Sequence, residues 1–332
     1  MLDWYDNHGR DLVWRRGRPE PYRVWLSEVM LQQTTTAHAA PYYERFLALW
    51  PTVKDLAAAP EEQVMAEWAG LGYYSRARNL IKCARAVVGD YHGVFPGHED
   101  ELIKLPGFGP YTAAAVAAIA FGRPANVVDG NIERIMTRLY AIETPLPEGR
   151  AEVREAGAQW LDAARAGDWP QALMDLAATT CRPKAPLCML CSLREACVAF
   201  DRGEQERFPV KAAKVAKPRR HGIAFLIVNG DRVLVERRPD KGLLGGMLGL
   251  PHTEWRGQPY AASEVVAPVA THEVGGYEHV FTHFALSQAV WRAEVDDAEA
   301  AKLVRRRNDW QWLPIDAQKA LPTVFRKALA YL

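Results

Sequence analysis

The segment Leu105-Pro106-Gly107-Phe108-Gly109-Pro110-Tyr111 separates two stretches with helical periodicity, and it decides how the first half of the chain folds. Its two glycines allow the backbone to turn tightly and to approach another molecule closely. The helix that follows, starting near Tyr111, offers unpaired N–H groups and the positive end of its dipole to an anion. We predict a helix–hairpin–helix over about residues 100–122, with Gly107 and Gly109 facing a DNA phosphate. A plain connector between two helices is the alternative.

Apolar periodicity divides the chain of 332 residues into two parts, each long enough to bury a core. Up to residue 201, stretches such as PEEQVMAEWAGL repeat apolar residues every three to four positions, which predicts an all-α domain over residues 1–201. After that, GIAFLIV and RVLVERR flank Asn229-Gly230, a strong hairpin signal. With a closing helix near PTVFRKALAYL, the pattern predicts an α+β domain over residues 222–332.

Charge is unevenly distributed although the net charge is only +1. Residues 202–221, RGEQERFPVKAAKVAKPRRH, hold 7 basic and 2 acidic side chains. Their prolines and weak periodicity predict a basic linker, either a plain tether or an arm that contacts phosphates. The low net charge argues against binding of nucleic acid by bulk charge alone. No apolar run is long enough to cross a bilayer and the first residues do not form a signal peptide, so we expect a cytoplasmic protein without a membrane partner.

Four of the five cysteines lie close together, and they give the most specific signal in the sequence. Cys181, Cys188, Cys191 and Cys197 follow the pattern C-x6-C-x2-C-x5-C. In a chain without a secretion signal, this spacing favours a metal site over disulfides. Structural zinc sites usually combine two separated C-x2-C pairs, and only one is present here. Four thiolates this close fit a [4Fe-4S] cluster better, with zinc as the alternative.

Two carboxylates are candidates for acid–base chemistry. Glu28 interrupts an otherwise apolar helix and shares a stripe with Val24 and Leu31, at i, i+4 and i+7. Loss of water on such a stripe favours a protonated carboxyl, which is a candidate general acid. The alternative is a buried glutamate paired with an arginine. Asp129 precedes the helix IERIMTRLYAI, and its alternative role is that of a simple N-cap.

Taken together, the motifs resemble the MutY family of adenine DNA glycosylases, which belong to the helix–hairpin–helix glycosylases with an iron–sulfur loop. The resemblance covers nearly the whole chain, and its motifs occur in the family's order. They are SEVMLQQT (27–34), GLGYYSRARNL (70–80), LPGFGPYTA (105–113), VVDGNIERI (127–135) and the cysteine loop (181–197). Endonuclease III-like relatives carry a catalytic lysine where this chain has Tyr111, so the resemblance implies neither a Schiff base nor strand cleavage.

The resemblance implies a monofunctional glycosylase of base excision repair, which flips out and hydrolytically removes adenine mispaired with 8-oxoguanine or guanine. Two carboxylates of unequal pKa suit this chemistry. Glu28 is implied to protonate adenine, and ionised Asp129 to stabilise the sugar cation, with Tyr111 and Asn131 orienting both. Gln33 is implied to wedge into the base stack together with Tyr73. The implied adenine-binding residues are Arg10, Trp14 and Gln171, and Leu31 is a further expected substrate-binding residue.

The second domain resembles the Nudix-like domain of the same family, which reads 8-oxoguanine. The Nudix hydrolase run G-x5-E-x7-R-E is absent between Gly242 and Leu332, so we expect binding and no hydrolysis. Phe281, Thr282 and His283 match the family's Phe-Ser-His loop; alternating residues of a strand are the alternative reading. The family further implies a [4Fe-4S] cofactor, mismatched double-stranded DNA as partner, a monomer, and association with the nucleoid on DNA.

Two other functions stay open. One is a glycosylase for pyrimidine lesions or mismatched thymine on the same scaffold, which Glu28 and the second domain disfavour. The other is a non-catalytic lesion-binding protein. It is disfavoured because a pure binder has no need for an acid on an apolar stripe.

Overall fold

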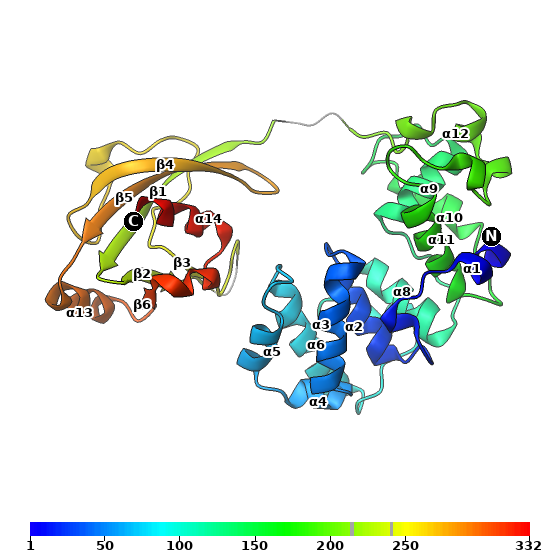
Figure 1. The fold of residues 1–332 in the computed structure, drawn as a ribbon, viewed down its shortest axis with the longest axis horizontal. Helices are drawn as coiled ribbons and strands as arrows, with labels where there is room; N and C mark the ends of the chain where they lie inside the picture. Colours follow the sequence, from blue (N-terminus) through cyan, green and yellow to red (C-terminus); the bar gives the residue numbers. More distant parts are fainter. Residues whose placement is uncertain (213–215, 240–241) are drawn as a thin grey trace. The chain divides into compact units, whose positions relative to one another are not determined.

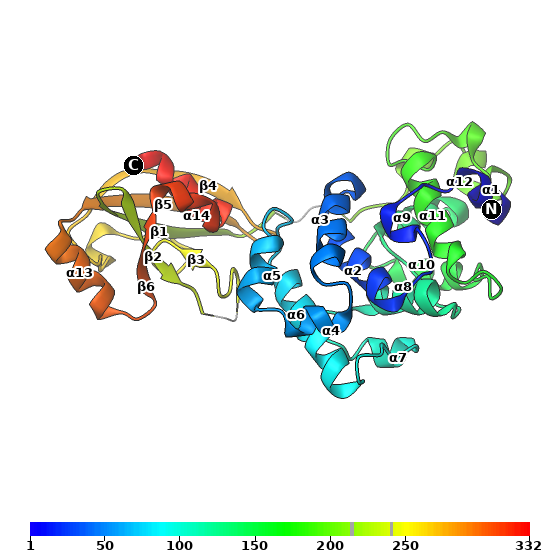
Figure 2. The same cartoon turned by 60° about the horizontal axis from the view of Figure 1, so that its bottom comes forward.

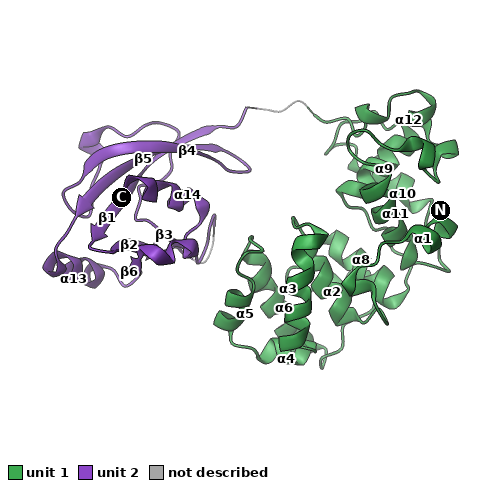
Figure 3. Cartoon of the chain, viewed as in Figure 1, with its two compact units in different colours: residues 1–213 green, residues 214–332 purple. Residues whose placement is uncertain are grey.

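The computed structural model describes residues 1–212, 216–239 and 242–332. It divides into two compact units, Met1–Ala213 and Lys214–Leu332 (Figure 3). Within the described ranges, no helix is long and apolar enough to span a membrane.

The first unit is helical, as predicted, and encloses one large apolar core. Its α-helices are α1 (Leu2–His8), α2 (Pro21–Leu31), α3 (Thr36–Leu49), α4 (Val53–Ala58), α5 (Glu61–Glu67), α6 (Ser75–Asp90), α7 (Glu99–Leu102), α8 (Pro110–Phe121), α9 (Gly130–Tyr140), α10 (Arg150–Ala158), α11 (Asp168–Thr179) and α12 (Val198–Asp201). Its 3-10 helices are η1 (Val13–Arg15), η2 (Cys188–Leu190), η3 (Arg194–Ala196) and η4 (Gln205–Arg207).

The predicted helix–hairpin–helix is formed by α7, the turn after it, and α8, which lie beside each other (Figure 2). Gly107 has a φ of 81°, and a Cβ there would lie 2.8 Å from Cβ of Asn79, so glycine is needed for both conformation and space. Pro110 opens α8, where its missing N–H costs nothing. The buried alanines of α8 let it pack closely against α2, which carries Glu28.

The second unit is a mixed sheet in the order β3-β2-β1-β5-β4, with β6 paired to β2 (Figure 1). β1 runs parallel to β5 and antiparallel to β2, which it meets through the predicted hairpin at Asn229 and Gly230. The strands are β1 (Arg219–Asn229), β2 (Arg232–Arg237), β3 (Leu248–Gly249), β4 (His272–Val280), β5 (Ala285–Glu294) and β6 (Trp310–Pro314). The helices are η5 (Ala262–Glu264), α13 (Asp297–Arg306), η6 (Ile315–Ala320), α14 (Thr323–Arg326) and η7 (Lys327–Tyr331).

Two apolar cores lie on opposite faces of this sheet, because alternate residues of β1 point in opposite directions. One core joins β1 to Phe325 of α14, and the other joins it to Leu303 of α13. The first set of β1 residues is Ala224, Leu226 and Val228; the second is Ile223, Phe225 and Ile227. The predicted α+β fold of this half is therefore present.

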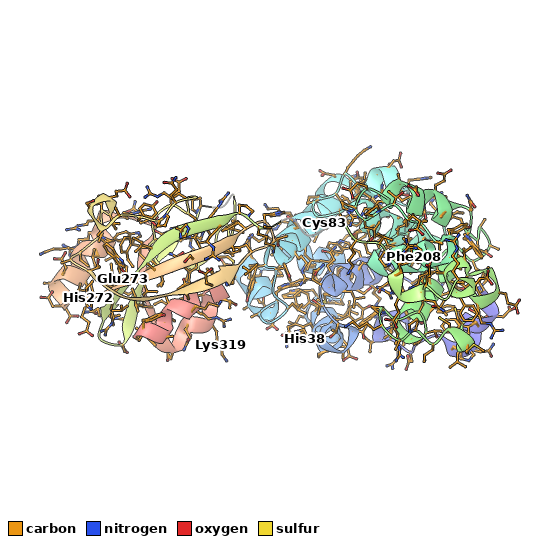
Figure 4. All side chains as sticks on the ribbon, turned by 90° about the horizontal axis from the view of Figure 1, so that it is seen from above. His38, Cys83, Phe208, His272, Glu273 and Lys319 are labelled. Carbon is orange, nitrogen blue, oxygen red and sulfur yellow. The ribbon has the colours of Figure 1, made fainter. Side chains whose placement is uncertain are left out.

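The structure differs from the predicted boundaries at the basic segment 202–221. Phe208 is only 1% exposed and packs against Ala141 and Ala199, inside the first unit (Figure 4). Arg207 forms ion pairs with Glu143 of the same unit, and β1 already begins at Arg219. The first unit thus extends beyond residue 201, because an aromatic side chain and tertiary ion pairs hold the segment down; residues 213–215 of the predicted linker lie outside the described residues.

Candidate active site

A cleft of about 440 Å³ in the first unit is lined from four helices that are far apart in sequence. The end of α2 contributes Glu28, the start of α8 contributes Tyr111, and the start of α9 contributes Asp129 and Asn131. Met174 of α11 also lines the cleft. Among the predicted DNA- and adenine-binding residues, the cleft includes Arg10, Leu31 and Gln33. The structure therefore gathers the four predicted catalytic residues in one place.

A smaller pocket of about 60 Å³ adjoins this cleft, since both share Arg10, Glu28 and Leu31. Trp14 and Gln171 line only the smaller pocket. The three predicted adenine-binding residues and Leu31 thus line one pocket, which Glu28 also lines.

Glu28 is 7% exposed, and its Oε2 accepts a hydrogen bond of 2.7 Å from the hydroxyl of Tyr111. Burial raises the pKa of Glu28 to about 7, although the hydrogen bond from Tyr111 acts in the other direction. The nearby charge of Asp129 raises the pKa further, and Arg15 lowers it. No arginine among the described residues forms an ion pair with Glu28, so the buried-pair alternative does not apply. This carboxyl can both donate and accept a proton near neutral pH.

Asp129 is the N-cap of α9, the role that its position in the sequence first suggested. Its Oδ1 accepts hydrogen bonds from the backbone N–H groups of Asn131 and Ile132, at 2.9 and 2.8 Å. Its Oδ2 accepts one from the side-chain amide of Asn131 at 2.8 Å. These contacts fix the carboxylate at the cleft wall, so the capping role and a role in the cleft are compatible.

A buried arginine connects this site to the cysteine loop. Both terminal nitrogens of Arg134 donate to Oδ1 of Asn131 at 3.3 Å, and its Nε donates to the carbonyl of Cys181 at 2.9 Å. The orientation of Asn131, and through it that of Asp129, is therefore tied to the first cysteine of the loop.

The cysteines of the loop lie close together: burial, and then the nearby thiol of Cys181, raise the pKa of Cys188, Cys191 and Cys197. Burial, followed by the neighbouring thiols, raises the pKa of Cys191 to about 11. Arg138 donates to Sγ of Cys181 at 3.3 Å and to the carbonyl of Arg182 at 2.8 Å. Among the described residues, no group of three or more His, Cys, Asp or Glu side chains is arranged to hold a single metal ion. Four thiols in one loop are nevertheless the donor set that a four-iron cluster takes. Lone Cys83 is fully buried in the core, as expected (Figure 4).

The two residues predicted to enter the base stack lie in loops, and the residues predicted to read 8-oxoguanine lie in the second unit. Gln33 and Tyr73 both sit in loops with left-handed backbone, at φ values of 58° and 49°, and Tyr73 is 63% exposed. In the second unit, the residues that match the Phe-Ser-His loop form the turn between β4 and β5 and not part of a strand. Phe281 packs against Trp255 and Phe284, whereas Thr282 and His283 are exposed.

Sequence reasoning missed Asp175, whose fully buried carboxylate binds the N-terminal segment. It accepts hydrogen bonds from the backbone N and the Nε of Arg10, at 2.8 and 2.7 Å, and two from Arg15. Burial alone would raise the pKa of Asp175, but these bonds outweigh burial and hold it below the ordinary value. The available signal was the spacing of Gln171, Met174 and Asp175 on α11, which places them on one helix face.

Comparison with known proteins assigns the chain to a family. The model of the HhH-GPD superfamily of base excision DNA repair proteins matches residues 26–162, and that of the NUDIX domain matches residues 223–331. An adenine DNA glycosylase of Rattus norvegicus is 33% identical over 98% of this chain and 76% of its own length. The chain belongs to the adenine DNA glycosylase family.

Other members of the family are longer than this chain. The adenine DNA glycosylase of Arabidopsis thaliana is 34% identical over 85% of this chain and 54% of its own length. The protein of the same name from Homo sapiens is 35% identical over 88% of this chain and 65% of its own length. The chain therefore spans between about half and two thirds of these two relatives.

Among solved structures, a thermostable thymine-DNA glycosylase matches with a TM-score of 0.56 and 29% identity, over 60% of this chain and 93% of its own. A trapped covalent intermediate of endonuclease III with DNA matches with a TM-score of 0.52 and 26% identity, over 61% and 93%. The family's fold therefore also serves enzymes that act on other bases or by other chemistry, and the cleft residues must distinguish among them.

Proposed function

We propose that the protein is a monofunctional DNA glycosylase that removes adenine mispaired with 8-oxoguanine or guanine in duplex DNA, in base excision repair. The observation that carries this proposal is the pair of carboxylates in one cleft. Glu28 is buried, with its pKa raised to about 7, and Asp129 is held by three hydrogen bonds at the wall. A proton donor and a fixed anion are the two groups that hydrolysis of a glycosidic bond requires.

In this reaction Glu28 transfers its proton to N7 of adenine, which makes the base a better leaving group. The bond between C1′ and N9 then breaks with its electron pair on adenine, leaving an oxocarbenium ion on the sugar. Asp129 stabilises that cation by its charge. Water adds to C1′ and gives its proton to Glu28, which restores the acid and leaves an abasic site. Tyr111 orients Glu28, and Asn131 orients Asp129.

The same cleft supports hydrolysis without strand cleavage. A glycosylase that also cleaves the strand uses an amine to form a Schiff base with the sugar. No lysine lines the described part of this cleft, and Tyr111 occupies the start of α8. Adenine must leave the base stack to reach Glu28. The smaller pocket, lined by Arg10, Trp14 and Gln171, is the proposed binding site for the extruded base.

The cysteine loop supports a [4Fe-4S] cofactor held by Cys181, Cys188, Cys191 and Cys197, in keeping with the family resemblance. Bound there, the cluster would cross-link the loop through four Fe–S bonds. Arg134 donates hydrogen bonds both to the carbonyl of Cys181 and to Oδ1 of Asn131, so the position of Cys181 would affect the orientation of Asn131. In the proposed complex, a DNA phosphate binds at Gly107 and Gly109. The residues Phe281, Thr282 and His283 recognise 8-oxoguanine. The protein acts as a monomer in the cytoplasm and associates with the nucleoid when it is bound to DNA.

Three matched duplexes test this proposal. They carry adenine opposite 8-oxoguanine, adenine opposite guanine, or thymine opposite guanine, and hot alkali reveals abasic sites after incubation. We expect the first duplex to be the best substrate and cleavage to require alkali. Preference for the thymine duplex would favour the thymine-mismatch alternative, and binding without any excision would favour the lesion-binding one. Strand cleavage that borohydride traps as a covalent adduct would contradict the assignment based on Tyr111.

A further inference from the structure

One buried guanidinium touches both of the loops that carry the proposed wedge residues, Gln33 and Tyr73. It belongs to Arg76, in the first turn of α6, which is 8% exposed. No carboxylate among the described residues pairs with it; its charge faces backbone carbonyl oxygens instead. Because a buried cation without a carboxylate is costly, this arrangement depends on those carbonyl groups being held in place.

The two terminal nitrogens of the guanidinium contact different segments: NH1 contacts the last turn of α2 and the residue before Gln33, and NH2 contacts the loop before Tyr73. NH1 donates to the carbonyls of Val29 and Met30, at 3.0 and 3.2 Å, and to that of Gln32, directly before Gln33. NH2 donates to the carbonyls of Leu71 and Gly72, at 2.9 and 3.2 Å, directly before Tyr73. The planar, rigid fork of arginine therefore fixes the distance between the two loops.

Other side chains hold the second loop in the same manner. The carbonyl of Ala69 accepts from the hydroxyl of Tyr42 at 3.0 Å, and that of Gly72 accepts from Nε1 of Trp68 at 3.0 Å. The carbonyl of Gly70 lies 3.2 Å from Nε2 of His38, on α3 (Figure 4). Every carbonyl from residue 69 to residue 72 thus has a side-chain donor.

Both wedge residues have the left-handed backbone that only glycine adopts without cost. Such strain persists only where the surroundings determine the conformation. Arg76 also stacks over the ring of Tyr73, with its guanidinium carbon 5.5 Å from the ring centroid, and over Trp68 at 5.2 Å. The contacts therefore reach the wedge side chain as well as its backbone.

We propose that Arg76 is a positioning residue for base extrusion: its guanidinium holds the loops of Gln33 and Tyr73 at a fixed separation, so that both side chains enter the base stack together. This inference rests on the proposed function, in which adenine must leave the duplex before excision. Arg76 is expected to affect the opening of the base stack and not the bond-breaking step, because it lines neither the cleft nor the smaller pocket.

Arg76→Lys tests the proposal, because an ammonium group keeps the charge but cannot span both loops. Single-turnover excision is measured on a fully paired duplex with adenine opposite 8-oxoguanine, and on the same lesion flanked by mismatches that already unstack the adenine. We expect the excision rate on the paired duplex to fall about 10- to 100-fold, as for one or two lost charge-assisted hydrogen bonds. On the unstacked duplex we expect the rate to fall less than about threefold. A 2-aminopurine next to the adenine should show a smaller fluorescence rise on binding the variant.

Arg85→Lys is the matched control, since Arg85 lies on the same helix and its Nε reaches only the carbonyl of Ala57, at 3.4 Å. Tyr42→Phe removes a single donor to the same loop, at the carbonyl of Ala69, and leaves Arg76 in place, so it tests this loop should Arg76→Lys fail to fold. We expect a smaller loss of excision rate, again confined to the paired duplex. Equal losses on both duplexes, or no loss on the paired one, would overturn the inference. A wild-type protein that excises adenine from neither duplex would instead contradict the proposed function.

Discussion

The hydroxyl of Tyr111 donates to Oε2 of Glu28 across the contact between α8 and α2, at 2.7 Å. Both side chains are largely removed from water, and burial raises the pKa of each. The close approach depends on the buried alanines of α8, which leave room for the two helices to pack. Helix packing in the core thereby sets the protonation of the proposed acid.

Tyr111→Phe should move the pH dependence of excision. The hydrogen bond from Tyr111 lowers the pKa of Glu28, so its loss raises that pKa by about half a unit to one unit. The proposed acid then stays protonated to higher pH, and the alkaline limb of the single-turnover rate shifts upward by the same amount. Tyr22→Phe is the control, because Tyr22 lies on α2 with Glu28 but its hydroxyl donates to the carbonyl of Trp50. An unchanged or acid-shifted limb would contradict this account.

Glu28→Gln should abolish excision while DNA binding persists. An amide of nearly the same shape fills the site but cannot transfer the proton, and general acid catalysis accounts for a factor of about 10² to 10⁴. Single-turnover kinetics on adenine opposite 8-oxoguanine, together with the Kd for the same duplex, separates the two effects. Activity within about tenfold of wild type would assign the acid to another residue.

The same substitution should stabilise the protein at alkaline pH. The folded-state pKa of Glu28, about 7, lies above the ordinary value of 4.5, so the folded protein binds more protons between these values. The free energy of unfolding therefore falls as pH rises through this window, by roughly 3 kcal/mol in total. Urea unfolding should show Glu28→Gln more stable than wild type near about pH 8, with the difference shrinking toward about pH 5. A difference independent of pH would exclude this group as its source.

Replacement of Cys188 by alanine should remove iron from the protein. Three remaining thiolates cannot complete the proposed four-thiolate cluster, and the loop loses the cross-link that the cluster would supply. Metal analysis of the purified variants measures the iron, and Cys83→Ala is the control because Cys83 is buried apart from the loop. Wild-type protein with one zinc and no iron would refute the cluster.

Thr282 should contribute to the choice of the opposite base. Its exposed hydroxyl lies in the turn between β4 and β5, next to the packed ring of Phe281. Thr282→Ala should reduce the preference for 8-oxoguanine over guanine by about three- to tenfold, as for one neutral hydrogen bond, while Thr282→Ser keeps it. The ratio of excision rates on the two duplexes is the readout. An alanine variant with the wild-type ratio would remove this residue from recognition.

The sequence predicted those parts of the molecule that local patterns encode. Glu28 was found because its spacing from Val24 and Leu31 places it on an apolar stripe, and the hairpin because Gly107 is needed for a local turn. Asp175 was not found because its arginine partners lie about 160 residues away in sequence, and Arg76 was not found because its role depends on carbonyls near Gln33, more than 40 residues away. The predicted linker at residues 202–221 was partly wrong for a similar reason. Its composition shows the basic side chains but not the distant acids that pair with them, such as Glu143 with Arg207.

The buried Asp175 has a consequence for how short a stable fragment of this protein can be. The family model begins at residue 26, after both arginines that neutralise this carboxylate. A protein trimmed to that start would leave this carboxylate without its two arginines, and removing the partners of a buried ion pair costs about 3–5 kcal/mol, a large share of a typical domain's stability. It would also lack Arg10 and Trp14 from the smaller pocket. The first 15 residues are thus part of the folded helical unit and of its smaller pocket. Shortened versions made for crystallisation or screening should retain them.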